Sequence, residues 1–268
     1  MPIMTVNGIN LYYEMVGQGF PVVFCHGYKG SHFEWALQVP VFSRDYKVIV
    51  MDHRGHCLSE APSSKDDYSI PIFARDVYEL LKLLNVEKCC LVGHSMGGFV
   101  ALQFIIDYPE MVKALILVDT GAKIEVISEY NQYMESQRRI ALEEGLEATF
   151  EYSVLHDPLT QKAIERYPYK REIMKQKLLN TSVEAYVYGI EAIAEWGGAV
   201  EHLRHISVPT MVIVGQDDED FLEMAEKMAE SIPNAQLCII PGAGHSPQED
   251  MPVVFNQLLM RFFRSVLN

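Results

Sequence analysis

The sequence has few cysteines, and none is spaced for a paired role. Its 268 residues include 5 cysteines, an odd number, and no Cys-x-x-Cys pair of the kind that holds structural zinc. A chain of this length does not need disulfides to stabilise its core, and Cys25, Cys89, Cys90 and Cys238 lie within apolar runs. The sequence therefore predicts reduced, buried thiols and no structural zinc site.

Basic residues and long apolar runs are also scarce. There are 22 Lys and Arg residues against 36 Asp and Glu, a formal charge of −14. This charge disfavours nucleic acids and anionic membranes as partners, because binding them requires a cationic surface. No apolar run approaches the roughly 20 residues of a transmembrane helix, and residues 1–10 lack the basic and apolar regions of a signal peptide. We expect a soluble, cytoplasmic protein, monomeric or homodimeric.

The hydrophobic residues, 49% of the chain, alternate between two patterns. Short apolar runs indicate strands, and apolar residues three or four apart indicate helices, as in residues 73–84 and 255–263. The strand runs are a hairpin in residues 3–16, then residues 22–25, 48–51, 89–92, 115–118, 211–214 and 237–240. Because these later runs are almost entirely apolar, they fit strands buried on both faces. The pattern predicts an α/β fold with a mostly parallel central sheet flanked by helices.

One segment interrupts this alternation. Residues 122–205 contain no strand run and are dominated by helical patterns. Loops of that length without structure of their own are uncommon in compact domains. We therefore expect a helical cap, inserted after the sixth strand of a core that is formed by residues 1–121 and 206–268.

The motif that points most directly to chemistry is Gly-His-Ser-Met-Gly at residues 93–97. It follows the predicted strand at residues 89–92 and precedes a helical pattern. A serine on a tight strand-to-helix turn presents its hydroxyl at the carboxyl edge of the sheet, where the start of the helix favours negative charge. The context therefore predicts Ser95 as a nucleophile.

A serine hydroxyl needs a base, and the base needs a carboxylate to orient it. His245 lies in the loop at residues 241–247, between the last strand and the last helix, which brings it to the same edge of the sheet. His94 neighbours the serine, but adjacent side chains on such a turn diverge, so we expect it to support the site rather than act as the base. Four acids at residues 217–220 follow the strand at 211–214.

With Ser, Asp and His in that chain order, the sequence resembles the serine hydrolases of the α/β-hydrolase fold superfamily. The superfamily pattern Gly-x-x-Asp after this strand falls on Asp218, which the resemblance makes the favoured acid. Asp217 is the nearest alternative. Asp119, at the end of the strand before the cap, is the other position where some relatives keep the acid.

Two further segments carry the resemblance. Residues 25–28, Cys-His-Gly-Tyr, match the superfamily's oxyanion loop, which implies that the backbone N–H groups of Tyr28 and Met96 stabilise the oxyanion. Residues 52–59 resemble its Asp-x-Arg-Gly-x-Gly-x-Ser segment, but Cys57 stands where glycine is usual. The histidines and the cysteine of this segment lack the spacing of a metal motif. We expect neither a metal nor a cofactor.

The resemblance implies a hydrolase that cleaves a carboxylic ester or lactone of a small, largely apolar substrate through an acyl-enzyme. Two alternatives stay open: a C–C bond hydrolase or synthase acting on a carboxylated ring or ring-cleavage product, and a ligand receptor with slow or no turnover. Carboxylated substrates would need cations in the cap, where the candidates are Arg138, Arg139, Lys170 and Arg171. Epoxide hydrolases and haloalkane dehalogenases of this fold use an aspartate nucleophile, so Ser95 argues against both.

The cap is rich in aromatic residues. Half of the 14 tyrosines fall within residues 122–205, which suits an apolar or aromatic acyl group. Packing of the cap against the core explains the same residues equally well. The candidate substrate-binding residues are His26, Gly27, Phe33, Trp35, His94, Tyr133, Trp196 and Phe221.

Overall fold

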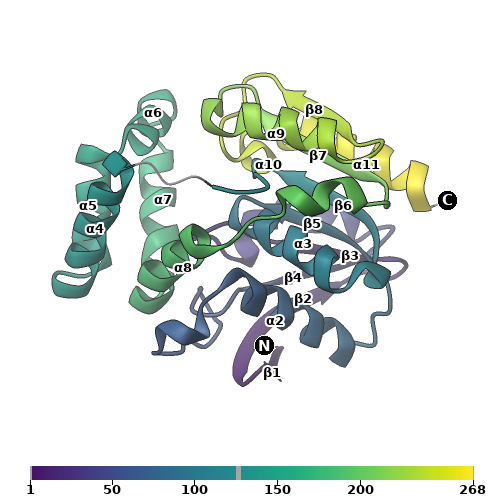
Figure 1. The fold of residues 1–268 in the computed structure, drawn as a ribbon, viewed down its shortest axis with the longest axis horizontal. Coiled ribbons are helices and arrows are strands. Elements are labelled where there is room, and N and C mark those ends of the chain that lie inside the picture. The colour runs from purple at the N-terminus through teal and green to yellow at the C-terminus, as the bar shows by residue number, and fades with distance from the viewer. Residues whose placement is uncertain (1, 125–127, 268) are drawn as a thin grey trace.

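A single eight-stranded sheet organises the protein (Figure 1). The computed structural model describes residues 2–124 and 128–267. The strands are β1 (Ile3–Val6), β2 (Ile9–Val16), β3 (Pro21–Cys25), β4 (Lys47–Met51), β5 (Cys89–His94), β6 (Val112–Val118), β7 (Thr210–Gly215) and β8 (Gln236–Ile240). Their order in the sheet is β1-β2-β4-β3-β5-β6-β7-β8, with antiparallel pairing of β1 with β2 and of β2 with β4 and parallel pairing elsewhere. The predicted hairpin and the six later strands are confirmed.

The strands from β3 to β7 are buried on both faces, and their side chains divide between two hydrophobic clusters. Val23 and Cys25 belong to one cluster, while Val22 and Phe24 belong to the other. This division follows from the two-residue period of a strand. The expectation fails for β8, where Leu237 and Ile239 are exposed, because β8 is the edge strand of the sheet.

Helices cover the two faces. The cluster on one face includes residues of α2, α3 and α9, and the cluster on the other includes residues of α1 and α11. The core helices are α1 (Val39–Phe42), α2 (Ile70–Leu83), α3 (Met96–Asp107), α9 (Glu219–Ser231), α10 (Pro247–Asp250) and α11 (Pro252–Leu267), with short 3-10 helices η1 (His32–Trp35), η2 (Lys65–Asp67), η3 (Pro109–Met111) and η4 (Val200–His205). Within the described ranges, no helix combines the length and the apolar character needed to cross a membrane.

A group of helices lies between β6 and β7 in the chain. They are α4 (Ser128–Glu143), α5 (Leu146–His156), α6 (Pro158–Arg166), α7 (Lys170–Leu179) and α8 (Val183–Glu195). In Figure 1, α4 to α7 stand to one side of the sheet and α8 lies between them and the core. A separate hydrophobic cluster, which includes Phe150, Leu178 and Tyr186, joins α4, α5, α7 and α8. We refer to the described part of residues 122–205 as the cap and to the rest of the chain as the core; the division into two such units stays a prediction.

The five cysteines carry free thiols. Cys25, Cys89 and Cys90 are buried in the sheet, as predicted, and Cys57 and Cys238 are partly buried. Burial raises the pKa of Cys25 and of Cys90 to about 12, since a thiolate loses its hydration in an apolar core. These thiols are therefore inert packing groups.

Candidate active site

Ser95 occupies a strained turn between β5 and α3. Its backbone has φ 51° and ψ −117°, in a region that side-chain-bearing residues rarely adopt. The turn also requires glycine at two flanking positions. A Cβ on Gly93 would lie 2.2 Å from the Gly97 carbonyl oxygen, and a Cβ on Gly97 would lie 2.3 Å from the Cys25 carbonyl oxygen. The two glycines of the motif therefore allow the close approaches that hold Ser95 at the carboxyl edge of the sheet.

His245 and Asp218 meet Ser95 at this edge. The Nε2 atom of His245 lies 3.0 Å from Ser95 Oγ, and its Nδ1 atom lies 2.7 Å from Asp218 Oδ2. Burial would raise the pKa of Asp218, but its hydrogen bond and charge interaction with His245 lower it. The three side chains thus form a continuous chain from a buried carboxylate to a hydroxyl. This is the arrangement that a base-activated serine nucleophile needs.

Asp119, one of the two alternative acids, lies behind Asp218. Its Oδ1 accepts a hydrogen bond from Gly215 N at 2.9 Å. One carboxylate oxygen of Asp119, one of Asp218 and a ring nitrogen of His245 all lie within 4.8 Å of one another. Asp119 is fully buried, and burial, together with the neighbouring Asp218 carboxylate, raises its pKa well above the usual range. The opposite pKa shifts favour the protonated form of Asp119 and the charged form of Asp218.

The other alternative, Asp217, points away from the base. Its carboxylate forms an ion pair with Arg166 of the cap. Phe221, from the first turn of α9, lies instead against the base, with its ring 4.9 Å from the His245 ring. Phe221, a predicted substrate-binding residue, thus lies beside His245.

The loop after β3 faces the serine. A Cβ on Gly27 would lie 3.2 Å from Ser95 Cβ, so the glycine lets this loop approach the nucleophile closely. Tyr28 follows in the chain, and Met96 is the first residue of α3. The first N–H groups of a helix have no partner within the helix. This placement suits the predicted oxyanion donors, whose role stays a prediction.

His94 is held by groups on both sides of its ring. Its Nδ1 lies 2.8 Å from Glu34 Oε1, and its Nε2 lies 2.6 Å from the His245 carbonyl oxygen. Burial alone would lower the pKa of His94, but the charge and hydrogen bond of Glu34 raise it. Both ring nitrogens are engaged inside the protein, which corrects the expectation that His94 binds substrate. Its position instead fixes the loop that carries His245.

Sequence reasoning missed Glu34. It is buried, and burial would raise its pKa, but the His94 charge and hydrogen bond lower it to about 2. The only sequence signal is an acid set among aromatic residues in His32–Trp35. Its partner is 60 residues away, so the pairing is visible only in the fold.

The expectation that His26 binds substrate is also corrected, because this residue is fully buried. Its Nδ1 donates to the Gly27 carbonyl at 2.8 Å and its Nε2 accepts from His53 N at 2.9 Å. Burial lowers its pKa well below the usual value, and the nearby His53 and His56 lower it further. His26 is therefore a neutral imidazole that holds the loop at residues 25–28 in place and has no exposed surface for substrate.

The expectation that the two tryptophans bind substrate is corrected because both are buried. Trp35 has no exposed surface and packs against Phe24, at a ring distance of 4.9 Å, on the face of the sheet covered by α11. Trp196 is buried against Phe99, and its indole N–H donates to Gln103 of α3 at 2.9 Å. Both rings pack within the protein rather than line a substrate pocket.

The remaining two candidates line pockets between core and cap. Tyr133 lines one pocket together with Tyr28 and Tyr186. Phe33, whose side chain is 63% exposed, lines another together with Ile173 of α7. Their contribution to substrate binding stays a prediction.

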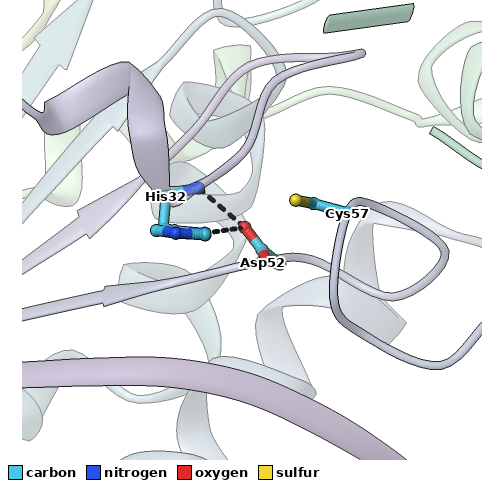
Figure 2. Close-up of side chains that lie close together, drawn as sticks. All are labelled: His32, Asp52 and Cys57. Atoms are coloured by element: carbon cyan, nitrogen blue, oxygen red, sulfur yellow. Dashed lines mark hydrogen bonds and ion pairs between the residues drawn. The ribbon is translucent and has the colours of Figure 1, made fainter. Parts of the chain in front are cut away.

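A second cluster of polar side chains lies outside this site. Figure 2 shows the Cys57 thiol directed toward Asp52, whose Oδ1 accepts from His32 N at 2.7 Å and from His32 Nδ1 at 2.8 Å. Asp52 Oδ2 accepts from Leu58 N at 3.1 Å. Burial, and the Asp52 charge in addition, raise the pKa of Cys57 to about 11. The hydrogen bonds of Asp52 to His32 and to Leu58 brace the 52–59 loop.

Comparisons with known proteins agree with this geometry. A family model for the alpha/beta hydrolase fold matches residues 21–252. The chain is 28% identical over 252 residues to a putative 2-succinyl-6-hydroxy-2,4-cyclohexadiene-1-carboxylate synthase of Bacillus subtilis, covering 91% of this chain and 90% of that protein.

Two solved structures are similar over nearly the whole chain. A thermophilic esterase from Thermogutta terrifontis has a TM-score of 0.88 and 28% identity, covering 99% of this chain and 98% of that one. The enol-lactonase from Burkholderia xenovorans LB400 has a TM-score of 0.87 and 25% identity, covering 98% of this chain and 100% of that one. The chain belongs to the α/β-hydrolase fold family.

Proposed function

We propose that the protein is a carboxylic ester hydrolase, acting on an ester or lactone through an acyl-enzyme on Ser95. The observation that carries this proposal is the chain of contacts from Asp218 through His245 to Ser95, at 2.7 Å and 3.0 Å, on a strained strand-to-helix turn. The structural likeness to an esterase and to an enol-lactonase supports the same reaction class.

In the proposed mechanism, His245 accepts the proton of Ser95 Oγ as the oxygen attacks the substrate carbonyl. Asp218 stabilises the resulting imidazolium and keeps its Nδ1–H oriented. The N–H groups of Tyr28 and Met96 stabilise the oxyanion of the tetrahedral intermediate. His245 then protonates the leaving alcohol, and later activates the water that releases the acid and restores Ser95.

The ion pairs of the cap argue against a substrate whose carboxylates would be bound by cap cations. The four cations that were candidates for binding carboxylates all have acidic partners within the protein. Arg138 pairs with Glu191, Arg139 with Glu143, Lys170 with Asp250 and Arg171 with Glu151. These pairs argue against their use as a binding site for the carboxylated rings of the C–C hydrolase and synthase reactions.

The likeness to the Bacillus subtilis synthase keeps that second reaction class as an alternative. A panel of short esters, long esters, acyl-homoserine lactones and dicarboxylated ring-cleavage products separates the two. Turnover confined to the last group would replace the esterase proposal with C–C bond chemistry.

Replacement of Ser95 by alanine tests the nucleophile. With 4-nitrophenyl butyrate as substrate, Ser95→Ala should lower kcat by at least about 10³-fold, because removal of a catalytic serine costs several orders of magnitude. A circular dichroism spectrum and a melting curve establish that the variant is folded. Retention of wild-type kcat by the folded variant would refute the assignment.

A further inference from the structure

A pocket between the core and the cap contains a lysine beside the predicted oxyanion loop. The pocket is lined by the aromatic side chains of Tyr28, Tyr133 and Tyr186, and by Lys29. Lys29 immediately follows Tyr28, and consecutive Cα atoms lie about 3.8 Å apart. Its backbone has φ 62°, so the fold holds this long side chain in a conformation that favours glycine.

The Lys29 ammonium has no carboxylate partner among the described residues, although two charged groups line the same pocket. Asp157 uses its oxygens to cap α6, accepting from Leu159 N at 3.2 Å and from Thr160 Oγ1 at 2.6 Å. Arg138 is neutralised by Glu191 at 3.1 Å. Within the part of the chain that the structure describes, Lys29 is therefore a cation of this pocket that no carboxylate contacts.

The surroundings of Lys29 make that imbalance costly. The side chain is partly buried, and its ammonium lies 5.3 Å from the centre of the Tyr28 ring. Burial lowers the pKa of Lys29, against the opposing effect of Asp157, because a cation loses its hydration there. A bound anion would restore the missing electrostatic partner, since a partly buried charge is stabilised by a paired and hydrogen-bonded counter-charge.

The other polar groups of the pocket already bond to one another. The hydroxyl of Tyr28 donates to the Tyr186 carbonyl, and the hydroxyl of Tyr186 donates to Gln137 Oε1 at 2.5 Å. Val187 and Ile190 complete an apolar wall. The pocket thus resembles a site for a short apolar chain that ends in a negative charge.

We propose that Lys29 is a specificity-determining residue that binds a carboxylate on the substrate, so that the preferred substrates are esters or lactones carrying one anionic group. This inference rests on the proposed ester hydrolase function. It differs from binding by the cap cations, because Lys29 belongs to the core loop that also supplies Tyr28.

Paired substrates test the inference. The first pair is mono-4-nitrophenyl glutarate, with a carboxylate on the acyl side, against 4-nitrophenyl butyrate. The second is 4-acetoxybenzoate, with a carboxylate on the alcohol side, against phenyl acetate. The measured quantity is the ratio of kcat/KM for the anionic ester to kcat/KM for the neutral one.

Lys29→Met should lower this ratio about 10-fold or more for at least one pair, as expected for loss of a hydrogen bond between charged groups. Lys29→Arg keeps the charge and should retain most of the ratio, and Lys29→Gln replaces Lys29→Met if the latter does not fold. Arg139→Met is the matched control, because it removes one positive charge from the cap at an exposed pair with Glu143. Ratios in Lys29→Met that equal those of Arg139→Met for both pairs would overturn the inference.

A binding measurement separates this inference from the proposed reaction. In the Ser95→Ala background, isothermal titration with mono-4-nitrophenyl glutarate should give a Kd about 10-fold weaker when Lys29→Met is added. If wild type hydrolyses no ester but this difference persists, the reaction assignment fails and the anion site stands. If wild type hydrolyses the neutral esters and neither the Kd nor the ratios depend on Lys29, the reaction stands and the anion site fails.

Discussion

The core and the cap use charged residues in opposite ways. The core buries charges in close pairs, as in Arg54 and Asp76, which lie 2.6 Å apart with side chains 2% and 1% exposed. The cap meets the core through four ion pairs, Lys162 with Glu219, Arg166 with Asp217, Lys170 with Asp250, and Lys177 with Glu249, of which the first is exposed to water and the third is mostly buried. Breaking a buried pair leaves an uncompensated charge, whereas surface pairs are weak and screened by salt. Removal of one charge from a buried core pair should therefore destabilise the fold, whereas the exposed ion pairs between cap and core should weaken as the salt concentration rises.

The acidic partners of the cap lie beside the candidate catalytic residues. Asp217 precedes Asp218, and Asp250 bonds to Gly244 N at 2.9 Å, next to His245. These two acids thus connect the cap to the loops that carry Asp218 and His245. Cap docking and the geometry of the site are physically linked at this edge.

The largest effect should come from the two core acids, which differ in charge. Asp218→Asn should lower kcat about 10⁴-fold, because the amide holds His245 in the wrong tautomer. Asp119→Asn should change kcat by less than about tenfold. Its amide carbonyl can accept from Gly215 N, and its amide N–H can donate to the neighbouring Asp218 carboxylate. Steady-state kinetics with 4-nitrophenyl butyrate measures both.

Asp119→Ala supplies the control for this comparison, because it removes the donor and the acceptor together. Its kcat should fall between those of the two asparagine variants. A 10⁴-fold loss in Asp119→Asn, with near-wild-type kcat in Asp218→Asn, would instead make Asp119 the charged partner of the base.

The buried pair of Glu34 and His94 gives a pH dependence to core stability. The pKa of Glu34 is lowered from 4.5 to about 2, so its contribution is present above pH 4.5 and is lost as the pH falls toward 2. The pKa of His94 is raised from 6.5, so its contribution is present below pH 6.5 and is lost as the pH rises through its folded-state pKa. The pair should therefore stabilise the protein most between pH 4.5 and pH 6.5.

Glu34→Gln should lower the free energy of unfolding by about 3 kcal/mol at pH 5.5, as for other broken buried pairs. Urea denaturation from pH 3 to pH 8 measures the effect. Below pH 4.5, the free energy of unfolding should fall less steeply with decreasing pH in the variant than in wild type. Identical slopes would show that the pair does not carry the acid sensitivity.

Local patterns in the sequence identify the strands and the residues at their ends. The family resemblance selects Asp218 from the four acids at residues 217–220. The apolar runs locate the strands, and parallel strands bring their carboxyl ends to one edge, so the sequence predicts Ser95, Asp218 and His245 close together although they are far apart in the chain. Their contacts at 3.0 Å and 2.7 Å follow from that topology. Their catalytic role stays a proposal.

The orientation of single side chains is not encoded so locally. Trp35 and Phe33 are two residues apart in η1, yet one is fully buried and the other is 63% exposed, because a short helix turns its residues to different sides. Trp196 packs on α3, which a helical pattern in the cap alone does not indicate. Lys29 and Glu34 stand out only once their neighbours are known.

At the boundary between core and cap, Lys170 should have the largest effect. Its side chain is 16% exposed and that of Asp250 is 1% exposed, so Lys170→Met leaves a buried carboxylate without its cation. We expect a loss of about 2 kcal/mol in the free energy of unfolding, and a lower kcat because Asp250 holds the loop of His245. Urea denaturation and ester kinetics at pH 7 measure the two effects. Lys170→Arg should retain both the stability and the kcat of wild type. Unchanged stability in Lys170→Met would show that the ion pair with Asp250 does not help to hold the cap on the core.

The smallest effect should come from Lys162, whose pair with Glu219 has side chains 67% and 78% exposed. Lys162→Met should change the free energy of unfolding by less than about 0.5 kcal/mol, since exposed pairs in water contribute little. Raising the salt concentration from 0.05 to 0.5 M, about a threefold decrease in screening length, should remove the difference between Lys162→Met and wild type but not that between Lys170→Met and wild type. Equal salt sensitivity of the two variants would contradict a graded boundary, because burial would then not decide how strongly each ion pair holds the cap.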